Sequence, residues 1–126
     1  MKQSIVTARA AFGGAVTGWI CAVFGLVVAL GLGGVLSWSG GTKTLVGSVF
    51  GVIGCLLGGF RAGLLERSAP LSNGAAAGGL TAVALAMVGV VQDPSRVGGV
   101  LFGIFIGASF GTFGAMVSNI SARRPR

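Results

Sequence analysis

The chain has 126 residues, of which 53% are hydrophobic, 25 are Gly, nine are Lys or Arg and two are Asp or Glu. A water-soluble domain is usually about a quarter charged, so this single-domain chain has too few charges to cover a surface in water. The net charge of +7 does not indicate a nucleic-acid partner, because the basic residues flank apolar runs and form no patch interleaved with aromatic residues.

The first apolar run covers residues 10–36 and contains no charged side chain. It is longer than the apolar core of a signal peptide, so we expect a retained transmembrane helix. A turn follows at residues 37–42, and Trp38 suits the membrane interface. The second apolar run, residues 44–60, predicts the second helix.

The most charged internal stretch follows, with Arg61, Glu66 and Arg67. Residues 71–91 predict a third helix, and residues 92–95 predict a tight turn. Asp93 is suited to cap the fourth helix, predicted over 94–118, with Pro94 as its first residue. We expect residues 119–126 to form a basic cytoplasmic tail.

These segments predict an all-α fold, a polytopic membrane protein with four transmembrane helices. Alternate loops then lie on opposite sides of the bilayer. Seven cations fall on the side of the termini and two on the other, and the positive-inside rule therefore predicts that both termini are cytoplasmic. The seven are Lys2, Arg9, Arg61, Arg67, Arg123, Arg124 and Arg126, and the two are Lys43 and Arg96. We expect the loop and tail arginines to set topology and to face lipid headgroups.

An offset of 60 residues aligns the chain with itself. It places residues 14–18 on 74–78, and it matches three glycines of the second run with three of the fourth: Gly47 with Gly107, Gly51 with Gly111, and Gly54 with Gly114. One offset for both halves suggests two duplicated helical hairpins in the same orientation. Chance matching is the alternative, because Gly, Ala and Val dominate this chain.

Small residues recur every three or four positions, which places them on one face of each helix. In lipid the hydrophobic effect does not drive helices together. Such faces let helix backbones approach closely, and the contacts between the backbones then hold the helices together. The predicted packing positions are Gly14, Gly18, Gly47, Gly51, Gly54, Gly58, Gly74, Gly78, Gly99, Gly103, Gly107 and Gly111. Either these glycines pack the four-helix bundle on itself, or at least one face also binds a second copy or another membrane protein.

The chain offers little for catalysis. It has no His and no Tyr, and its two carboxylates, Glu66 and Asp93, fall on opposite sides of the predicted membrane. They cannot form an acid–base pair, so we expect no enzyme and no catalytic, cofactor or metal site. The hydroxyls within the spans (Thr17, Ser48, Thr81, Ser109 and Thr112) either bond to their own helix or line a path for a neutral solute.

The stretch Gly58-Gly59-Phe60-Arg61-Ala62-Gly63, followed after a short loop by Asn73-Gly74-Ala75-Ala76-Ala77-Gly78, resembles small four-helix prokaryotic membrane proteins of the YrzE-like family. The resemblance covers the middle third of the chain. That family often has a basic residue soon after the first of these stretches, whereas here Leu64 follows directly and Arg67 comes later. The resemblance implies four helices in the inner membrane of a prokaryote and implies no activity.

The sequence thus predicts a non-enzymatic membrane protein that acts by glycine-mediated helix packing. Its partners would be the lipid bilayer and either copies of itself or other membrane-protein subunits. The alternative is a small channel, a holin-like pore, or a carrier for a neutral or lipidic solute.

Overall fold

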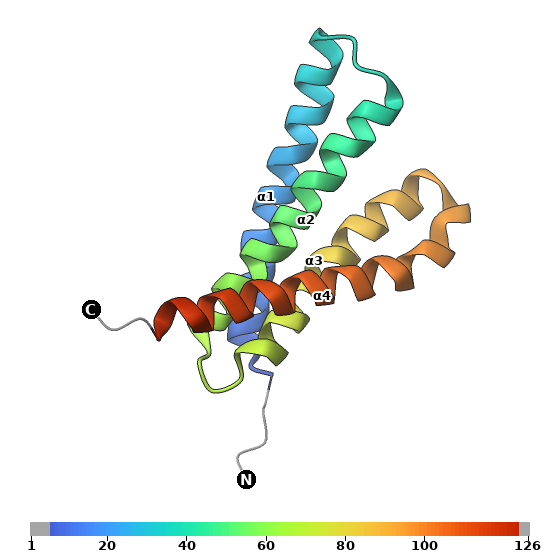
Figure 1. The fold of residues 1–126 in the computed structure, drawn as a ribbon. Helices are drawn as coiled ribbons and strands as arrows, with labels where there is room; N and C mark the ends of the chain where they lie inside the picture. Colours follow the sequence, from blue (N-terminus) through green and yellow to red (C-terminus); the bar gives the residue numbers. More distant parts are fainter. Residues whose placement is uncertain (1–5, 124–126) are drawn as a thin grey trace.

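A computed structural model describes residues 6–123 of the chain and shows four long helices (Figure 1). They are α1 (Ala8–Val35), α2 (Gly40–Leu65), α3 (Pro70–Gln92) and α4 (Val97–Ala122), with a short 3₁₀ turn, η1 (Pro94–Arg96), before α4. Each long helix is long and apolar enough to cross a membrane. The predicted all-α fold with four membrane-spanning helices is confirmed.

Local chemistry explains where helices begin. The hydroxyl of Ser39 accepts a hydrogen bond from the backbone N–H of Thr42 and so caps α2. Pro70 stands at the first position of α3, where its fixed φ suits a helix. Asp93 accepts a bond from the N–H of Ser95, so it caps η1 rather than α4 itself.

Three predicted boundaries are wrong: both ends of the second helix and the end of the fourth. The second helix is longer than the predicted 44–60 at both ends, since α2 runs from Gly40 to Leu65. Lys43 and Arg61 therefore lie within it. Long cationic side chains can reach the interface from inside a helix, so a charge does not mark its end. Residues 119–122 continue α4, so the basic tail begins at Arg123. Arg124 and Arg126 lie outside the described residues.

Within residues 6–123, the core is built from small side chains. Its buried apolar residues are alanines and one cysteine, and its largest fully buried side chains are Asn73, Thr81 and Ser118. Large apolar side chains point outward instead: Leu101 is 78% exposed and Phe105 72%. A soluble protein has the opposite arrangement. This distribution suits a protein whose surroundings are lipid chains.

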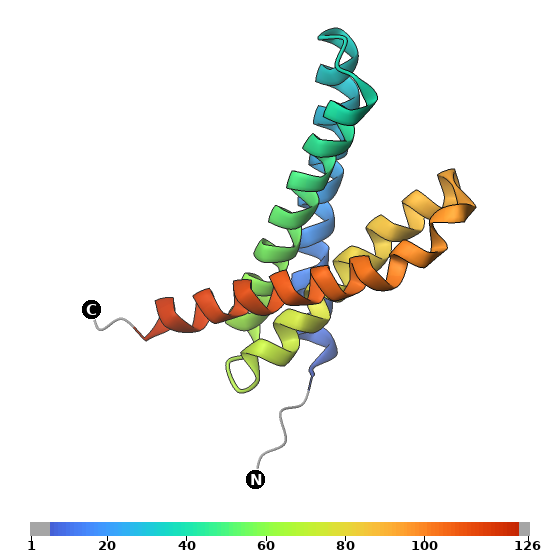
Figure 2. The same ribbon diagram turned by 45° about the vertical axis from the view of Figure 1, so that its right-hand side comes forward.

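The helices form two hairpins, α1–α2 and α3–α4, that contact each other near the termini and diverge toward their turns. The divergence is visible in two views separated by 45° (Figures 1 and 2). Helix α2 packs on both helices of the second hairpin, and α1 packs on α3. The molecule therefore has the shape of a V, with the two hairpins as its arms.

The two hairpins use matching glycine contacts, but in a register that differs from the sequence alignment. Gly18 packs on Gly54 in the first hairpin, and Gly78 packs on Gly107 in the second. From Gly18 to Gly78 is 60 residues, but from Gly54 to Gly107 is 53. The packing register of the second and fourth helices thus differs from the offset of 60 that aligns them in the sequence. Residues about seven apart lie on the same helix face. An offset of 53 and an offset of 60 therefore both align glycines of α2 with glycines of α4.

This register makes the first hairpin longer. Gly18 and Gly54 are 36 residues apart, whereas Gly78 and Gly107 are 29 apart. Seven extra residues shared between two helices lengthen each by about 5 Å, close to one helical turn. The α1–α2 hairpin therefore projects farther beyond its glycine contact than the α3–α4 hairpin does.

Candidate functional site

Close backbone contact holds each hairpin together near the termini. A Cβ added at Gly58 would lie 2.8 Å from the carbonyl oxygen of Gly14, and one at Gly54 would lie 2.7 Å from that of Gly18. In the second hairpin, Gly74 and Gly78 approach the backbones of Gly111 and Gly107 in the same way. Eight of the twelve predicted packing glycines thus have their partner within the chain.

A further glycine contact joins the hairpins, and the predicted packing set did not include it. Gly59 of α2 lies against the backbone of Gly111, and Gly114 of α4 lies against the backbone of Leu56 and Phe60. Gly59 continues the four-residue spacing of Gly47 and Gly51, and Gly114 stands beside the stripe of α4. Each therefore faces a second neighbouring helix. The spacing of small residues indicated that such faces exist but not which helix each face meets.

Asn73 links the start of α1 to α3. Its side chain is fully buried, its Oδ1 accepts the backbone N–H of Thr7 at 2.8 Å, and its Nδ2 donates to the carbonyl of Ala69 at 2.8 Å. A buried amide needs these partners because its polar atoms are costly to leave unpaired. Sequence reasoning missed this role, although an Asn in the first turn of an apolar span was the available signal.

Most hydroxyls within the spans bond to their own helix. Thr17, Thr81, Ser109 and Thr112 each donate to the carbonyl four residues earlier. That alternative is confirmed for these four, and Ser48 is exposed. A hydroxyl bonded in this way has its one donor occupied and keeps its lone pairs as acceptors, as Thr17 does for Arg61.

The outer parts of the glycine faces have no partner in the described chain. A Cβ added at Gly47, Gly99 or Gly103 would meet no atom within 4 Å, and one at Gly51 would meet only the Leu85 side chain, at 3.2 Å. The predicted stripe on α4 therefore divides. Its half nearer the C-terminus packs on α3, and its other half stays open.

These open glycines line a cleft of about 610 Å³ between the hairpins. All four helices contribute to it. Trp19, Cys55 and Gly107 come from the region where the hairpins meet, and Thr44 and Gln92 come from the ends nearest the turns. The indole of Trp19 donates to the carbonyl of Leu80 at 3.3 Å, which ties α1 to α3 beside the cleft. The cleft is thus apolar inside, with polar side chains toward the turns.

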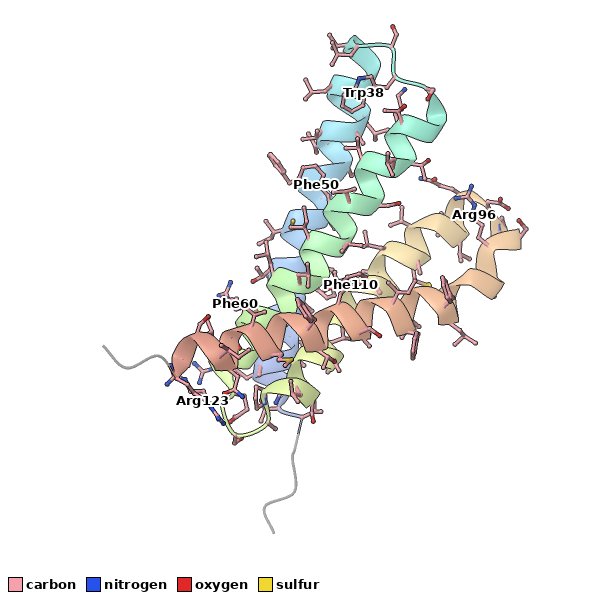
Figure 3. The ribbon with its side chains drawn as sticks, viewed as in Figure 1. Trp38, Phe50, Phe60, Arg96, Phe110 and Arg123 are labelled. Atoms are coloured by element: carbon pink, nitrogen blue, oxygen red, sulfur yellow. The ribbon has the colours of Figure 1, made fainter. Side chains whose placement is uncertain are left out.

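A second, smaller hollow of about 330 Å³ adjoins the cleft near the turn of the second hairpin. It is lined by Arg96 and Val100, together with three residues that also line the cleft, Ala86, Gly89 and Gly99. Figure 3 shows Arg96 at the turn of the α3–α4 hairpin. The guanidinium of Arg96 donates from Nε to Oδ2 of Asp93 at 3.3 Å; the Arg96 side chain is largely exposed and that of Asp93 about half exposed. The shared lining places a cation at the margin of the cleft.

The other predicted arginines lie toward the end of the molecule where the termini are (Figure 1). Arg61 donates from Nη1 to the hydroxyl of Thr17 at 2.8 Å and so joins α2 to α1. Arg67 and Arg123 are exposed, and Figure 3 shows Arg123 at the end of α4 far from Arg96. In the loop after α2, hydrogen bonds from Ser68 hold the pKa of Glu66 below its usual value. These positions suit contact with headgroups.

No model of a known protein family, no curated protein and no solved structure matches this chain. The resemblance to the YrzE-like family therefore stays a prediction.

Proposed function

We propose that this chain is a non-enzymatic subunit of a prokaryotic cytoplasmic membrane that acts through close packing of its glycine faces. It would do so as a homo-oligomer or as an accessory subunit of a larger membrane complex. Both termini would face the cytoplasm, as the distribution of cations suggests. One observation carries the proposal: among residues 6–123, no helix packs on the outer glycine face of α4, with Gly99 and Gly103.

The occupied half of the same helix supports this reading. At Gly107 and Gly111 the backbone of α3 comes into direct contact with α4. Gly99 and Gly103 continue this stripe at the same spacing, and they present an equivalent surface toward the cleft. In lipid, such a surface gains dispersion contacts when another helix packs on it closely. A partner helix would thus extend the packing that α3 begins.

The test is the double substitution Gly99→Leu with Gly103→Leu. Both positions have open space for a side chain, so the chain should still fold while the cleft face is blocked. We expect the assembly formed by the unsubstituted protein in mild detergent to dissociate, as measured by light scattering after size-exclusion chromatography. Gly107 is unsuitable for this test because it packs on Gly78 within the chain.

Gly98→Leu is the matched control. Gly98 also has open space around it, but it does not line the cleft. It should leave the assembly intact. An unchanged assembly in the Gly99–Gly103 double variant would refute the proposal.

The cleft favours a second candidate function, the binding or carrying of a lipidic solute. Its volume of about 610 Å³ lies within the range of small-molecule sites, and its lining is mainly apolar. Among the channel, pore and carrier alternatives, a carrier for a lipidic solute is the one that needs no polar path through the helices. It is therefore compatible with hydroxyls that bond to their own helices. Proteoliposomes that move a fluorescent phospholipid between leaflets no faster than empty vesicles would count against a carrier.

A further inference from the structure

We propose that the cleft between the hairpins binds one glycerophospholipid, with an acyl chain between the hairpins and the phosphate at Arg96. This inference rests on the second candidate function and names its ligand. Three observations support it: the apolar interior of the cleft, the polar groups toward its turn end, and the cation beside it.

The first observation is the apolar interior. A cleft lined by residues such as Trp19, Ala22 and Leu85 does not hold water well, because apolar cavities offer it few hydrogen-bond partners. Left empty, its walls would lose dispersion contacts. In a bilayer the surrounding molecules are lipids with apolar chains. An acyl chain is therefore the occupant that the surroundings supply.

The second observation is the polarity along the cleft. Thr44 lies near the start of α2 and Gln92 ends α3, so these polar side chains stand at the end near the turns, where a headgroup would lie. The opposite end holds Trp19 and Gly107. An amphiphile with a polar head and an apolar tail matches this order. Thr44 already donates to the carbonyl of Gly40, so Gln92 is the side chain that a uniformly apolar helix face would leave without a polar partner.

The third observation is Arg96. Its hollow shares Ala86, Gly89 and Gly99 with the cleft. Nε of Arg96 bonds to Asp93, and Oδ1 of Asp93 is already bonded to Ser95. A guanidinium has five N–H donors, so its Nη groups can still bind a phosphate. Such charge-assisted bonds are strong and can be bidentate.

The other cation at the turns, Lys43, lies elsewhere. Its aliphatic stem packs beside Gly33 of α1, on the face between α1 and α2, and it is not among the residues that line the cleft. Lys43 is therefore a matched control for Arg96. Both carry one positive charge at the same end of the molecule, but only Arg96 adjoins the cleft.

The position of the lipid chain can be tested by fluorescence quenching. Trp19 and Trp38 are the two tryptophans of the chain, so Trp38→Phe leaves Trp19, at the inner end of the cleft, as the only reporter. This protein is placed in phosphatidylcholine vesicles that contain a small fraction of phosphatidylglycerol with brominated chains. We expect strong quenching of Trp19, reduced at least twofold by Gly99→Leu with Gly103→Leu and unchanged by Gly98→Leu.

The role of the phosphate needs a second comparison. Brominated diacylglycerol carries the same chains without the phosphate, so it should quench Trp19 less at equal concentration. Arg96→Gln should weaken binding of the brominated phosphatidylglycerol about fivefold, the effect of one cation near a membrane surface. Lys43→Gln should leave it unchanged. Equal quenching by the two lipids, or equal effects of the two substitutions, would overturn the assignment of Arg96.

Native mass spectrometry of the same proteins separates this inference from the proposed assembly. One retained phospholipid per chain, lost in the Gly99–Gly103 double variant whatever the oligomeric state, supports the inference. An assembly without retained lipid that dissociates in the double variant would overturn it, because a protein partner would then fill the cleft. Equal quenching of Trp19 in the double variant would also overturn it.

Discussion

At single positions, the space around each glycine decides whether it can be replaced. Gly14 lies against the carbonyl of Gly58 and the side chains of Ala62 and Ala77, so three neighbours block a Cβ there. Gly31 of the same helix has no atom within 4 Å of an added Cβ. In the sequence, Gly14 and Gly31 are equivalent glycines of one apolar helix. The structure shows that Gly14 is packed and that Gly31 is open.

This contrast predicts opposite outcomes for the same substitution. Gly14→Ala should destabilise the fold by about 1–3 kcal/mol, because overpacking forces backbones apart. Gly31→Ala should leave stability unchanged or raise it slightly, because Ala is the better helix former. Unfolding in mixed micelles with increasing SDS would measure both variants. Similar losses of stability in the two variants would contradict this account of the packing.

Asn73 predicts a hydrogen-bond effect at one residue. Asn73→Ala removes the acceptor for Thr7 and the donor to Ala69. We expect a loss of about 1 kcal/mol, in the range measured for polar contacts between membrane helices. Its partly exposed neighbour, Ser72, provides the control Ser72→Ala, which should change stability by less. The same SDS titration would compare the two.

At the level of the elements, the existence and order of the helices followed from the apolar runs, and their ends did not. The apolar run predicts that the second helix lies between Lys43 and Arg61, but α2 includes both. Arg61 is stabilised there by its hydrogen bond to Thr17 of α1. The apolar pattern of a single segment does not predict a bond to another helix. The register of α2 against α4 was also inaccessible, because stripes of evenly spaced glycines match at several offsets.

The turn between α3 and α4 predicts a pH effect. Hydrogen bonds from Ser95, with a smaller contribution from Arg96, hold the pKa of Asp93 below its usual value. Because the pKa is lowered in the folded state, the ionised Asp93 cap stabilises the turn at pH values above the ordinary pKa of Asp. This contribution is lost as the pH falls through the lowered value.

Ser95→Ala should therefore raise the pKa of Asp93 toward its ordinary value. A carboxyl titration followed by NMR in micelles would measure the shift. Ser68→Ala, which alters the bond to Glu66 in the other loop, should leave Asp93 unaffected and so serves as the control. A pKa of Asp93 that stays low in the Ser95 variant would assign the shift to another cause.

For the whole molecule, four spans place the loop after α2 on one side of the bilayer and the turn at η1 on the other. Single cysteines at Ser68 and Ser95, in a background with Cys21 and Cys55 changed to Ala, should react with a membrane-impermeant maleimide from opposite sides. Intact cells would label Ser95→Cys alone if the termini are cytoplasmic. Labelling of both positions in intact cells would contradict the four-span arrangement, and labelling of Ser68→Cys alone would invert its orientation.

The shape of the molecule was the part least accessible from sequence. Glycine faces predicted close packing, and the inner halves of the helices show it. Nothing in the spacing distinguished Gly107, which meets Gly78, from Gly103, which meets open space. That difference arises because the hairpins diverge, and divergence depends on contacts between hairpins, such as Gly59 with Gly111, that a pattern within single helices does not encode.

The small-residue core has a thermodynamic consequence. Because the large apolar side chains already face outward in the folded state, separating the helices within a bilayer transfers little hydrocarbon surface into water. The heat-capacity change of unfolding grows with the apolar surface that becomes hydrated. We therefore expect this protein, unfolded while its helices remain inserted, to have a nearly temperature-independent enthalpy and an almost straight free-energy curve. Cooling should then not weaken the fold in the way it weakens a soluble domain of equal length.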